Sequence, residues 1–184
     1  MCRAVPHQRT DGFPPLLGPR PRVLILGSLP SQLSVRNRQY YGNPQNAFWS
    51  IMGELLGADP SQPYSARTKI LTEQGIAVWD VLANSVRPGS MDSGIDQASA
   101  VINDFEGFFA RNREIRMLCF NGQTAAKIFS DRASADVQAF VENIECATLP
   151  STSPAYASMN FADKLKRWSV ISIALGSGDC VQKH

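Results

Sequence analysis

The chain alternates short, largely apolar runs with longer segments whose apolar residues recur at helical spacing. Four runs bounded by Gly, Pro or Asn have the length and composition of buried strands, at residues 22–28, 76–80, 115–121 and 144–149. Five segments have the three-to-four-residue apolar period of helices, at residues 47–57, 66–74, 96–111, 123–129 and from Phe161 through Trp168 onward. The alternation predicts an α/β fold, a three-layer α/β/α sandwich with a central four-stranded parallel sheet.

A chain of 184 residues suits one domain with a sizeable core. Residues 1–21 are rich in Pro, Gly and Arg and predict an irregular lead-in, so the domain is expected to span residues 22–184. An apolar content of 43% with only 18% charged residues excludes wholesale disorder. No apolar stretch has the length of a membrane span and no signal peptide is evident, which predicts a cytoplasmic monomer without membrane contacts.

The cysteines and histidines lie too far apart to predict a metal site. Cys2, Cys119, Cys146 and Cys180 form no CxxC pair, so neither zinc nor an iron–sulfur cluster is expected. A disulfide scaffold is equally unsupported in a chain of this length. Cys119 and Cys146 lie in apolar runs and are expected to be small core residues. The sequence therefore predicts no metal and no other cofactor.

In a parallel α/β sheet, ligands bind beyond the carboxyl ends of the strands, so the segments that follow the strands hold the candidate site. The first of them starts with Gly27-Ser-Leu-Pro-Ser31, whose backbone N–H groups could face an anion. It is neither a Walker A loop nor a GxSxG nucleophile elbow. Because the only histidines are His7 and His184, near the two ends, catalysis by histidine is not expected.

The stretch from Tyr40 to Trp49 reads Tyr-Tyr-Gly-Asn-Pro-Gln-Asn-Ala-Phe-Trp and is the densest of the candidate segments. Asn46 is placed to cap the helix that follows it, and Phe48 and Trp49 are expected in the core. Taken singly, the Gly27 loop is a structural turn and Asn46 is a helix cap. The chemistry of the site therefore depends on the ordered set of segments.

That ordered set resembles the uracil-DNA glycosylase superfamily, and within it the hypoxanthine-DNA glycosylase (DNA-deoxyinosine glycosylase) branch. The resemblance covers roughly residues 22–175 and rests on these segments: Gly27-Ser-Leu-Pro-Ser31, Tyr40 to Trp49, Trp79-Asp-Val-Leu82, Arg87-Pro-Gly-Ser-Met-Asp92, Phe120-Asn-Gly-Gln-Thr-Ala125 and Leu149-Pro-Ser-Thr-Ser-Pro-Ala155. It implies a DNA glycosylase of base excision repair that flips deaminated bases out of DNA (hypoxanthine, uracil, xanthine) and hydrolyses their N-glycosidic bond, leaving an abasic site. The candidate segments contain no Lys, which argues for monofunctional hydrolysis and against a Schiff-base lyase.

The resemblance also implies roles for single residues. Most relatives carry Asp or Asn at the third position of the first loop and some carry Glu at the second, where this chain has Leu29 and Ser28. In the hypoxanthine branch Asn46 would take over water activation, so Asn46 and Ser28 are the expected catalytic residues. Tyr41 matches the position that stacks on the extruded base. The base-binding residues that the resemblance implies are Tyr41, Leu29, Asn121 and Asp80.

The loop after the fourth strand matches the segment that enters the DNA minor groove, although its usual leading His is Leu149 here. The distribution of charge favours DNA contacts in the first third of the chain as well. Residues 1–54 carry six basic and two acidic residues, a net charge of +4 (6 − 2), whereas the whole chain carries +2. The expected DNA contacts are Ser31, Arg36, Arg38, Pro150, Ser151, Thr152, Ser153, Pro154 and Tyr156.

Two departures from the family pattern, Leu29 and Leu149, keep other interpretations open. One is a broad-specificity uracil-DNA glycosylase of atypical motif. Another is a catalytically silent DNA-binding relative, which the missing carboxylate favours and the retained Tyr41 and Asn46 disfavour. A nucleoside hydrolase on the same α/β plan is a weaker third, because it would not need the minor-groove loop.

Overall fold

A parallel sheet of four strands forms the centre of the computed structural model, which describes residues 9–176. In sheet order the strands are β3 (Ile76–Asp80), β2 (Val23–Gly27), β6 (Met117–Asn121) and β7 (Glu145–Leu149). Every residue of β2 and β3 is buried, as the apolar composition of all but the last residue of β3, Asp80, favours when both faces are covered. The four predicted strands are thus confirmed.

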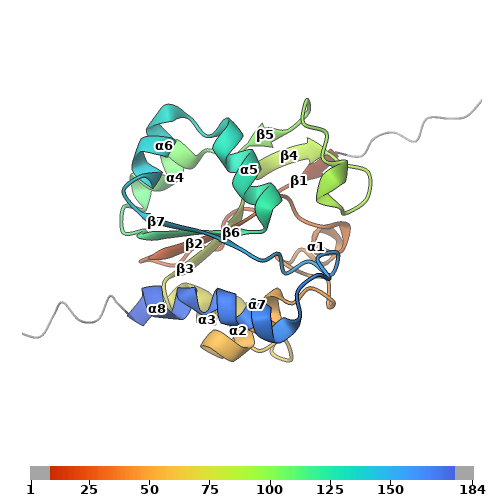
Figure 1. Ribbon diagram of the computed structural model, residues 1–184, viewed down its shortest axis with the longest axis vertical. Helices are drawn as coiled ribbons and strands as arrows, with labels where there is room; N and C mark the ends of the chain where they lie inside the picture. Colours follow the sequence, from red (N-terminus) through yellow and green to blue (C-terminus); the bar gives the residue numbers. More distant parts are fainter. Residues whose placement is uncertain (1–8, 177–184) are drawn as a thin grey trace, which may run out of the picture.

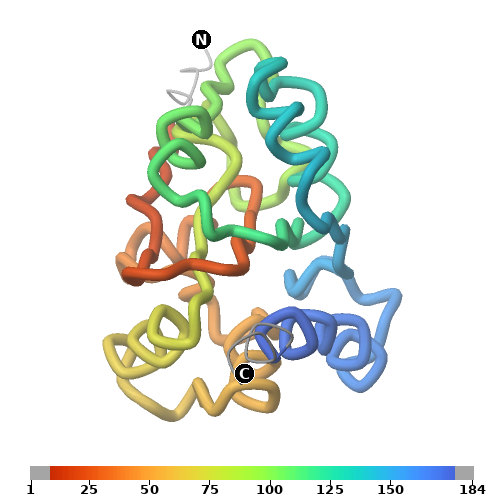
Figure 2. Tube along the Cα trace, turned by 90° about the vertical axis from the view of Figure 1, so that its left-hand side faces the viewer, coloured from red at the N-terminus to blue at the C-terminus, as the bar shows by residue number. Residues whose placement is uncertain are grey.

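Helices cover both faces of this sheet (Figure 1). One layer consists of α4 (Phe105–Arg111), α5 (Gln123–Arg132) and α6 (Ala135–Val141). The other consists of α2 (Phe48–Leu56), α3 (Tyr64–Glu73), α7 (Phe161–Trp168) and α8 (Val170–Gly176). Figure 2 shows α7 and α2 side by side although they lie far apart in the sequence. The predicted three-layer α/β/α sandwich is confirmed.

A second, antiparallel sheet was not predicted from the sequence. It consists of β1 (Arg9–Asp11), β4 (Leu82–Val86) and β5 (Val101–Ile102), in the order β1-β4-β5. The irregular lead-in expected over residues 1–21 is therefore wrong at β1, where Thr10 pairs with Ser85. A three-residue strand has no measurable apolar period, and its partner lies more than seventy residues away, so local pattern could not reveal it.

Several predicted helices have different bounds in the structure. The helix expected over residues 96–111 is wrong in its first half, because α4 begins only at Phe105 and Ile102 pairs with Leu82 in the small sheet. The start of α4 is fixed by Asp104, because its side chain accepts a hydrogen bond from the Gly107 N–H and caps the helix. The last helix is divided at Ser169 into α7 and α8. The elements not predicted here are α6, the short α1 (Gln32–Asn37) and the 3₁₀ turn η1 (Asp92–Gly94).

The two described cysteines differ in burial. Cys119 is fully buried in β6, as predicted, whereas Cys146 is exposed and the prediction for it is wrong. Cys146 lies in β7, an edge strand that pairs only with β6 and has exposed residues along most of its length. Within residues 9–176, no three His, Cys, Asp or Glu side chains are grouped to hold a metal ion, and no helix has the length and apolarity to cross a membrane.

Candidate active site

A pocket of about 600 Å³ opens at the carboxyl ends of the four parallel strands. The last residue of each strand lines it: Gly27, Asp80, Asn121 and Leu149. In the sheet register Gly27 pairs with Asp80 and Asn121 pairs with Leu149, so segments far apart in sequence converge here. The volume lies within the roughly 300–1,000 Å³ of small-molecule sites.

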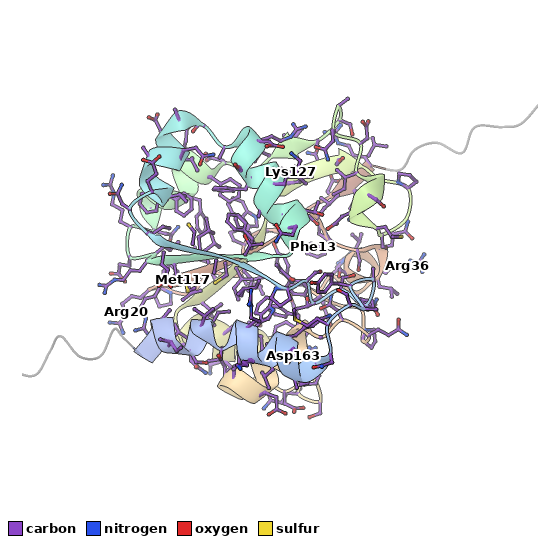
Figure 3. The ribbon with its side chains drawn as sticks, viewed as in Figure 1. Phe13, Arg20, Arg36, Met117, Lys127 and Asp163 are labelled. Atoms are coloured by element: carbon purple, nitrogen blue, oxygen red, sulfur yellow. The ribbon has the colours of Figure 1, made fainter. Side chains whose placement is uncertain are left out.

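Most of the residues expected in the site line this pocket. From the catalytic and base-binding sets they are Ser28, Leu29, Tyr41, Asn46, Asp80 and Asn121, and from the DNA-contact set they are Ser31, Pro150, Ser151, Thr152, Ser153, Pro154 and Tyr156. Arg36 and Arg38 do not line it. They are exposed at the end of α1, and Figure 3 shows Arg36 at the edge of the molecule. Their contact with DNA stays a prediction.

The adjacent tyrosines Tyr40 and Tyr41 have different roles in the structure. Tyr40 is buried and anchors the segment, because its carbonyl accepts from the Trp49 indole N–H at 2.9 Å and its N–H donates to the Tyr64 hydroxyl at 2.9 Å. Tyr41 lines the pocket with a left-handed backbone (φ 53°), which is uncommon for a residue with a side chain. One face of its ring stacks on Phe48, with centroids 3.9 Å apart. Stacking of Tyr41 on a base would therefore use its other face.

Gly27 leaves room for two polar groups on the pocket floor. A Cβ at this position would lie 2.5 Å from Asp80 Oδ1 and 3.3 Å from the Tyr41 hydroxyl oxygen. Both groups are buried, and neither Asp80 Oδ2 nor the Tyr41 hydroxyl has a hydrogen-bond partner among the described residues. Buried polar atoms are usually paired, so an unpaired set facing a pocket is suited to a polar ligand.

Asn46 lies at the start of α2 but one residue before the cap. The cap position is Ala47, so the predicted capping position is displaced by one residue. The Asn46 Oδ1 accepts a hydrogen bond from the Phe48 N–H at 2.9 Å, which fixes the side chain at the pocket wall. An amide oxygen has two lone pairs and an amide nitrogen has two donors, so this bond leaves most of the group's capacity for a ligand or water.

The side chain of Asn121 makes hydrogen bonds within the protein. Its Nδ2 donates to Thr152 Oγ1 at 2.8 Å, and its Oδ1 accepts from the Thr152 N–H at 2.9 Å. The Thr152 carbonyl in turn accepts from the Ala47 N–H, so one buried threonine ties the end of β6 to the start of α2. For the predicted contact with a base edge, the Asn121 amide therefore has only one N–H donor and one oxygen lone pair still available.

The loop from Pro150 to Tyr156 is held at both ends by α7. The Trp168 indole N–H donates to the Pro150 carbonyl at 3.0 Å, and the Lys164 ammonium donates to the Tyr156 carbonyl at 2.8 Å. The Lys164 ammonium also lies 5.2 Å from the centre of the Tyr156 ring. The loop is thus braced from below while its Ser and Pro side chains line the pocket.

Asp80 is the titratable group on the pocket floor. Burial raises its pKa to about 7, partly offset by the nearby Arg87 cation and reinforced by the Asp92 carboxylate. The pKa of Tyr41 is raised as well, first by burial and then by the negative charge of Asp80. Near neutral pH a large fraction of Asp80 is therefore a carboxylic acid, which can donate as well as accept a hydrogen bond.

We expect Asp80 to make the free energy of unfolding depend on pH. Because the pKa of Asp80 is about 7 in the folded protein and 3.8 ordinarily, its stabilising contribution is complete below 3.8 and is lost as the pH rises through 7. A rise of this size corresponds to roughly 4 kcal/mol. The loss is spread between pH 3.8 and 7, so urea unfolding at pH 5, 6, 7 and 8 should show about 3 kcal/mol of it in the wild type and a flatter profile in Asp80→Asn. Parallel profiles for the two proteins would contradict the assignment.

Sequence reasoning missed a charged group beneath the first loop. Arg87 is 2% exposed, and its guanidinium donates to the carbonyl of Leu29 at 3.4 Å and to that of Pro30. It also lies 3.7 Å from Asp92 Oδ1, the atom that accepts a hydrogen bond from the Ser28 hydroxyl at 2.6 Å. Arg87 and Asp92 bounded one of the resembling segments, but nothing in the sequence placed that segment under residues 28–30.

The pocket lining includes further residues that were not predicted, among them Met91 and Arg167. Met91 is 62% exposed on the loop before η1, so an apolar side chain stands at the pocket. Arg167 comes from the last turn of α7 and adds positive charge there. The helical period predicted α7 but not its packing beside the site.

Comparisons with known proteins agree with this geometry. The profile of the uracil DNA glycosylase superfamily matches residues 14–172. A hypoxanthine DNA glycosylase of Methanosarcina acetivorans is 42% identical over 117 residues, 63% of this chain and 73% of that protein, and one of Methanosarcina barkeri is 35% identical over 120 residues, 65% and 75% respectively. A solution NMR structure of a candidate uracil DNA glycosylase from M. acetivorans superposes with a TM-score of 0.74 at 34% identity, covering 92% of this chain and 99% of that one.

The sheet, the pocket at its carboxyl edge and these matches together define a DNA glycosylase, an enzyme whose substrate is DNA. The chain belongs to the uracil DNA glycosylase superfamily. The resemblance inferred from the ordered motifs is thereby confirmed, and the nucleoside hydrolase and silent-binder interpretations are set aside.

Proposed function

We propose that this DNA glycosylase acts on deaminated bases, with hypoxanthine as its principal substrate and uracil and xanthine as further substrates. It would extrude the base into the pocket at the carboxyl edge of the sheet and hydrolyse its N-glycosidic bond without lyase activity. The observation that carries the proposal is the convergence of the residues expected for this chemistry on one pocket. The names of the relatives, hypoxanthine DNA glycosylases, support the same base.

The chemistry of the floor suits a deaminated base. Deamination replaces an amino group by a carbonyl beside a ring N–H, so hypoxanthine, uracil and xanthine share a donor next to an acceptor. Asp80 Oδ2 and the Tyr41 hydroxyl are buried without partners, and the raised pKa of Asp80 supplies a hydrogen for a carbonyl oxygen or ring nitrogen. The free energy gained when these buried groups form hydrogen bonds with the base would help offset the few kcal/mol that extrusion of the base costs.

Hydrolysis needs an oriented water and a stabilised oxocarbenium-like sugar more than a strong nucleophile. The Asn46 amide, fixed by the Phe48 N–H, is suited to hold that water at the pocket wall. Among the described residues, the pocket lining holds no lysine and so offers no amine for a Schiff base. This supports the proposal of monofunctional base release.

A base-release assay tests the proposal. Labelled duplexes that carry hypoxanthine, uracil or xanthine are incubated with the protein and then cleaved with alkali at abasic sites. We expect breaks on the hypoxanthine duplex at the highest rate, and none before alkali treatment. Faster release of uracil than of hypoxanthine would favour the atypical uracil enzyme, and breaks without alkali would contradict monofunctional hydrolysis.

Arg36 and Arg38 are expected to bind phosphates next to the pocket. Each phosphate contact contributes about −0.9 to the slope of log affinity against log salt, so Arg36→Ala with Arg38→Ala should make that slope shallower by about 2. Arg20→Ala is the matched control, because Figure 3 shows Arg20 on the opposite side of the molecule from Arg36. Fluorescence anisotropy on a lesion duplex between 50 and about 300 mM salt measures the slopes. An unchanged slope in the double variant would place the phosphate contacts elsewhere.

A further inference from the structure

The hydrogen of the Ser28 hydroxyl is committed to a carboxylate from a distant loop. Ser28 follows β2 directly, and its Oγ donates to Asp92 Oδ1 at 2.6 Å, a short charge-assisted hydrogen bond. Both residues line the pocket. A hydroxyl has one hydrogen and two lone pairs, whereas a carboxylate only accepts. Ser28 Oγ can therefore offer the pocket only lone pairs, which makes it an acceptor for a water hydrogen.

Arg87 holds this pair in place from beneath. Its guanidinium lies 3.7 Å from Asp92 Oδ1 and donates to the carbonyls of Leu29 and Pro30. Arginine stays charged in proteins, so one buried cation fixes both the backbone of the first loop and the carboxylate beside it. The link between Ser28 and Asp92, 64 residues apart, is thus a built contact of the site.

No residue of the first loop, Gly27 to Ser31, carries a carboxylate. In the folded protein Asp92 brings a carboxylate to this loop, because its Oδ1 accepts a hydrogen bond from the hydroxyl of Ser28, the second loop residue. Asp92 also lines the pocket, and 40% of its side chain is exposed, so water can reach the carboxylate.

We propose that Asp92 is a positioning residue for hydrolysis, acting through Ser28 on the attacking water. The inference rests on the proposed base-release activity and adds a proton path to it. As the water oxygen bonds to C1′ of the sugar, one water hydrogen passes to Ser28 Oγ and the Ser28 hydrogen passes to Asp92 Oδ1. The C1′–N bond breaks with its electron pair leaving on the base, whose nitrogen takes up a proton from solvent. Asn46 holds the same water from the α2 side.

Single-turnover kinetics on a hypoxanthine duplex test this path with Ser28→Ala, Asp92→Asn and the double variant. We expect each single change to lower the maximal rate by about 100-fold, and the double variant to be little slower than either, because the two groups act as one unit. Affinity for a duplex with uncleavable 2′-fluoro-deoxyinosine should change less than about threefold, since the path acts on the water and not on base binding. Asp96→Asn, an acid on the same segment outside the pocket lining, is the matched control and should retain the wild-type rate.

The outcomes separate the two proposals. A wild type that releases none of the three bases would overturn the proposed function, and the proton path with it. An active wild type with Asp92→Asn at the wild-type rate would overturn the path alone. Effects of the two single changes that multiply in the double variant would show independent roles and would also contradict it. If Asp92→Asn did not fold by circular dichroism, Ser28→Ala would decide, because it removes only one oxygen atom.

Discussion

Replacing Asn46 by Ala is expected to lower the single-turnover rate of base release by about 100-fold or more, the scale of a lost proton-handling or water-orienting group. The residue lines the pocket wall, and most of the hydrogen-bonding capacity of its amide is free for water. Binding of an uncleavable lesion duplex should change little, because the loss lies in the chemical step. Quenched-flow or hand-mixed single-turnover assays with alkali cleavage measure the rate.

The structural role of Asn46 requires a matched variant. Its Oδ1 accepts from the Phe48 N–H at the start of α2, and the loss of such a bond costs about 0.5–2 kcal/mol of stability. Asn46→Asp keeps that acceptor and adds a stronger base, so it should fold as the wild type does and retain or exceed the wild-type rate. If Asn46→Ala retains full activity, the water-orienting role belongs to another residue, with Ser28 or Asp80 as the next candidates.

Replacing Trp168 by Ala is expected to lower the free energy of unfolding by about 3–5 kcal/mol. The side chain is fully buried, packs edge-on against Phe48 with ring centroids 6.0 Å apart, and donates its indole N–H to the Pro150 carbonyl. The substitution therefore removes core volume and the brace of the loop from Pro150 to Tyr156 at once. Urea denaturation followed by circular dichroism measures the stability.

Trp168→Phe separates these two effects. It retains an aromatic ring beside Phe48 but leaves the Pro150 carbonyl without the indole donor, which should cost about 1–3 kcal/mol. Both variants should bind lesion duplexes more weakly at a temperature where they remain folded, because the loop from Pro150 to Tyr156 loses its support. A Trp168→Ala protein within about 1 kcal/mol of the wild type would show that α7 does not stabilise the pocket wall.

The four central strands could be predicted because each is a short, largely apolar run with clear bounds, a signal that depends only on neighbours in sequence. The short strands β1 and β5 could not, since their stability comes from β4 and not from their own pattern. Cys146 shows the same limit. An apolar run tells that a strand forms, but its exposure depends on whether a further strand or helix covers it.

The sequence by itself determined the fold class and the edge of the sheet that holds the candidate site, which follow from local composition and from the rule that parallel strands end at a common edge. Its resemblance to the glycosylase family implied Tyr41, Asn46 and Asp80 as residues of that site. Only the tertiary structure decided which polar atoms are paired. It engages Asn121 with Thr152, leaves Asp80 Oδ2 unpaired on the floor, and brings Asp92 to Ser28 over a buried Arg87. Hydrogen bonding and burial depend on distances of a few tenths of an ångström between segments far apart in the chain, and no pattern along one segment contains them.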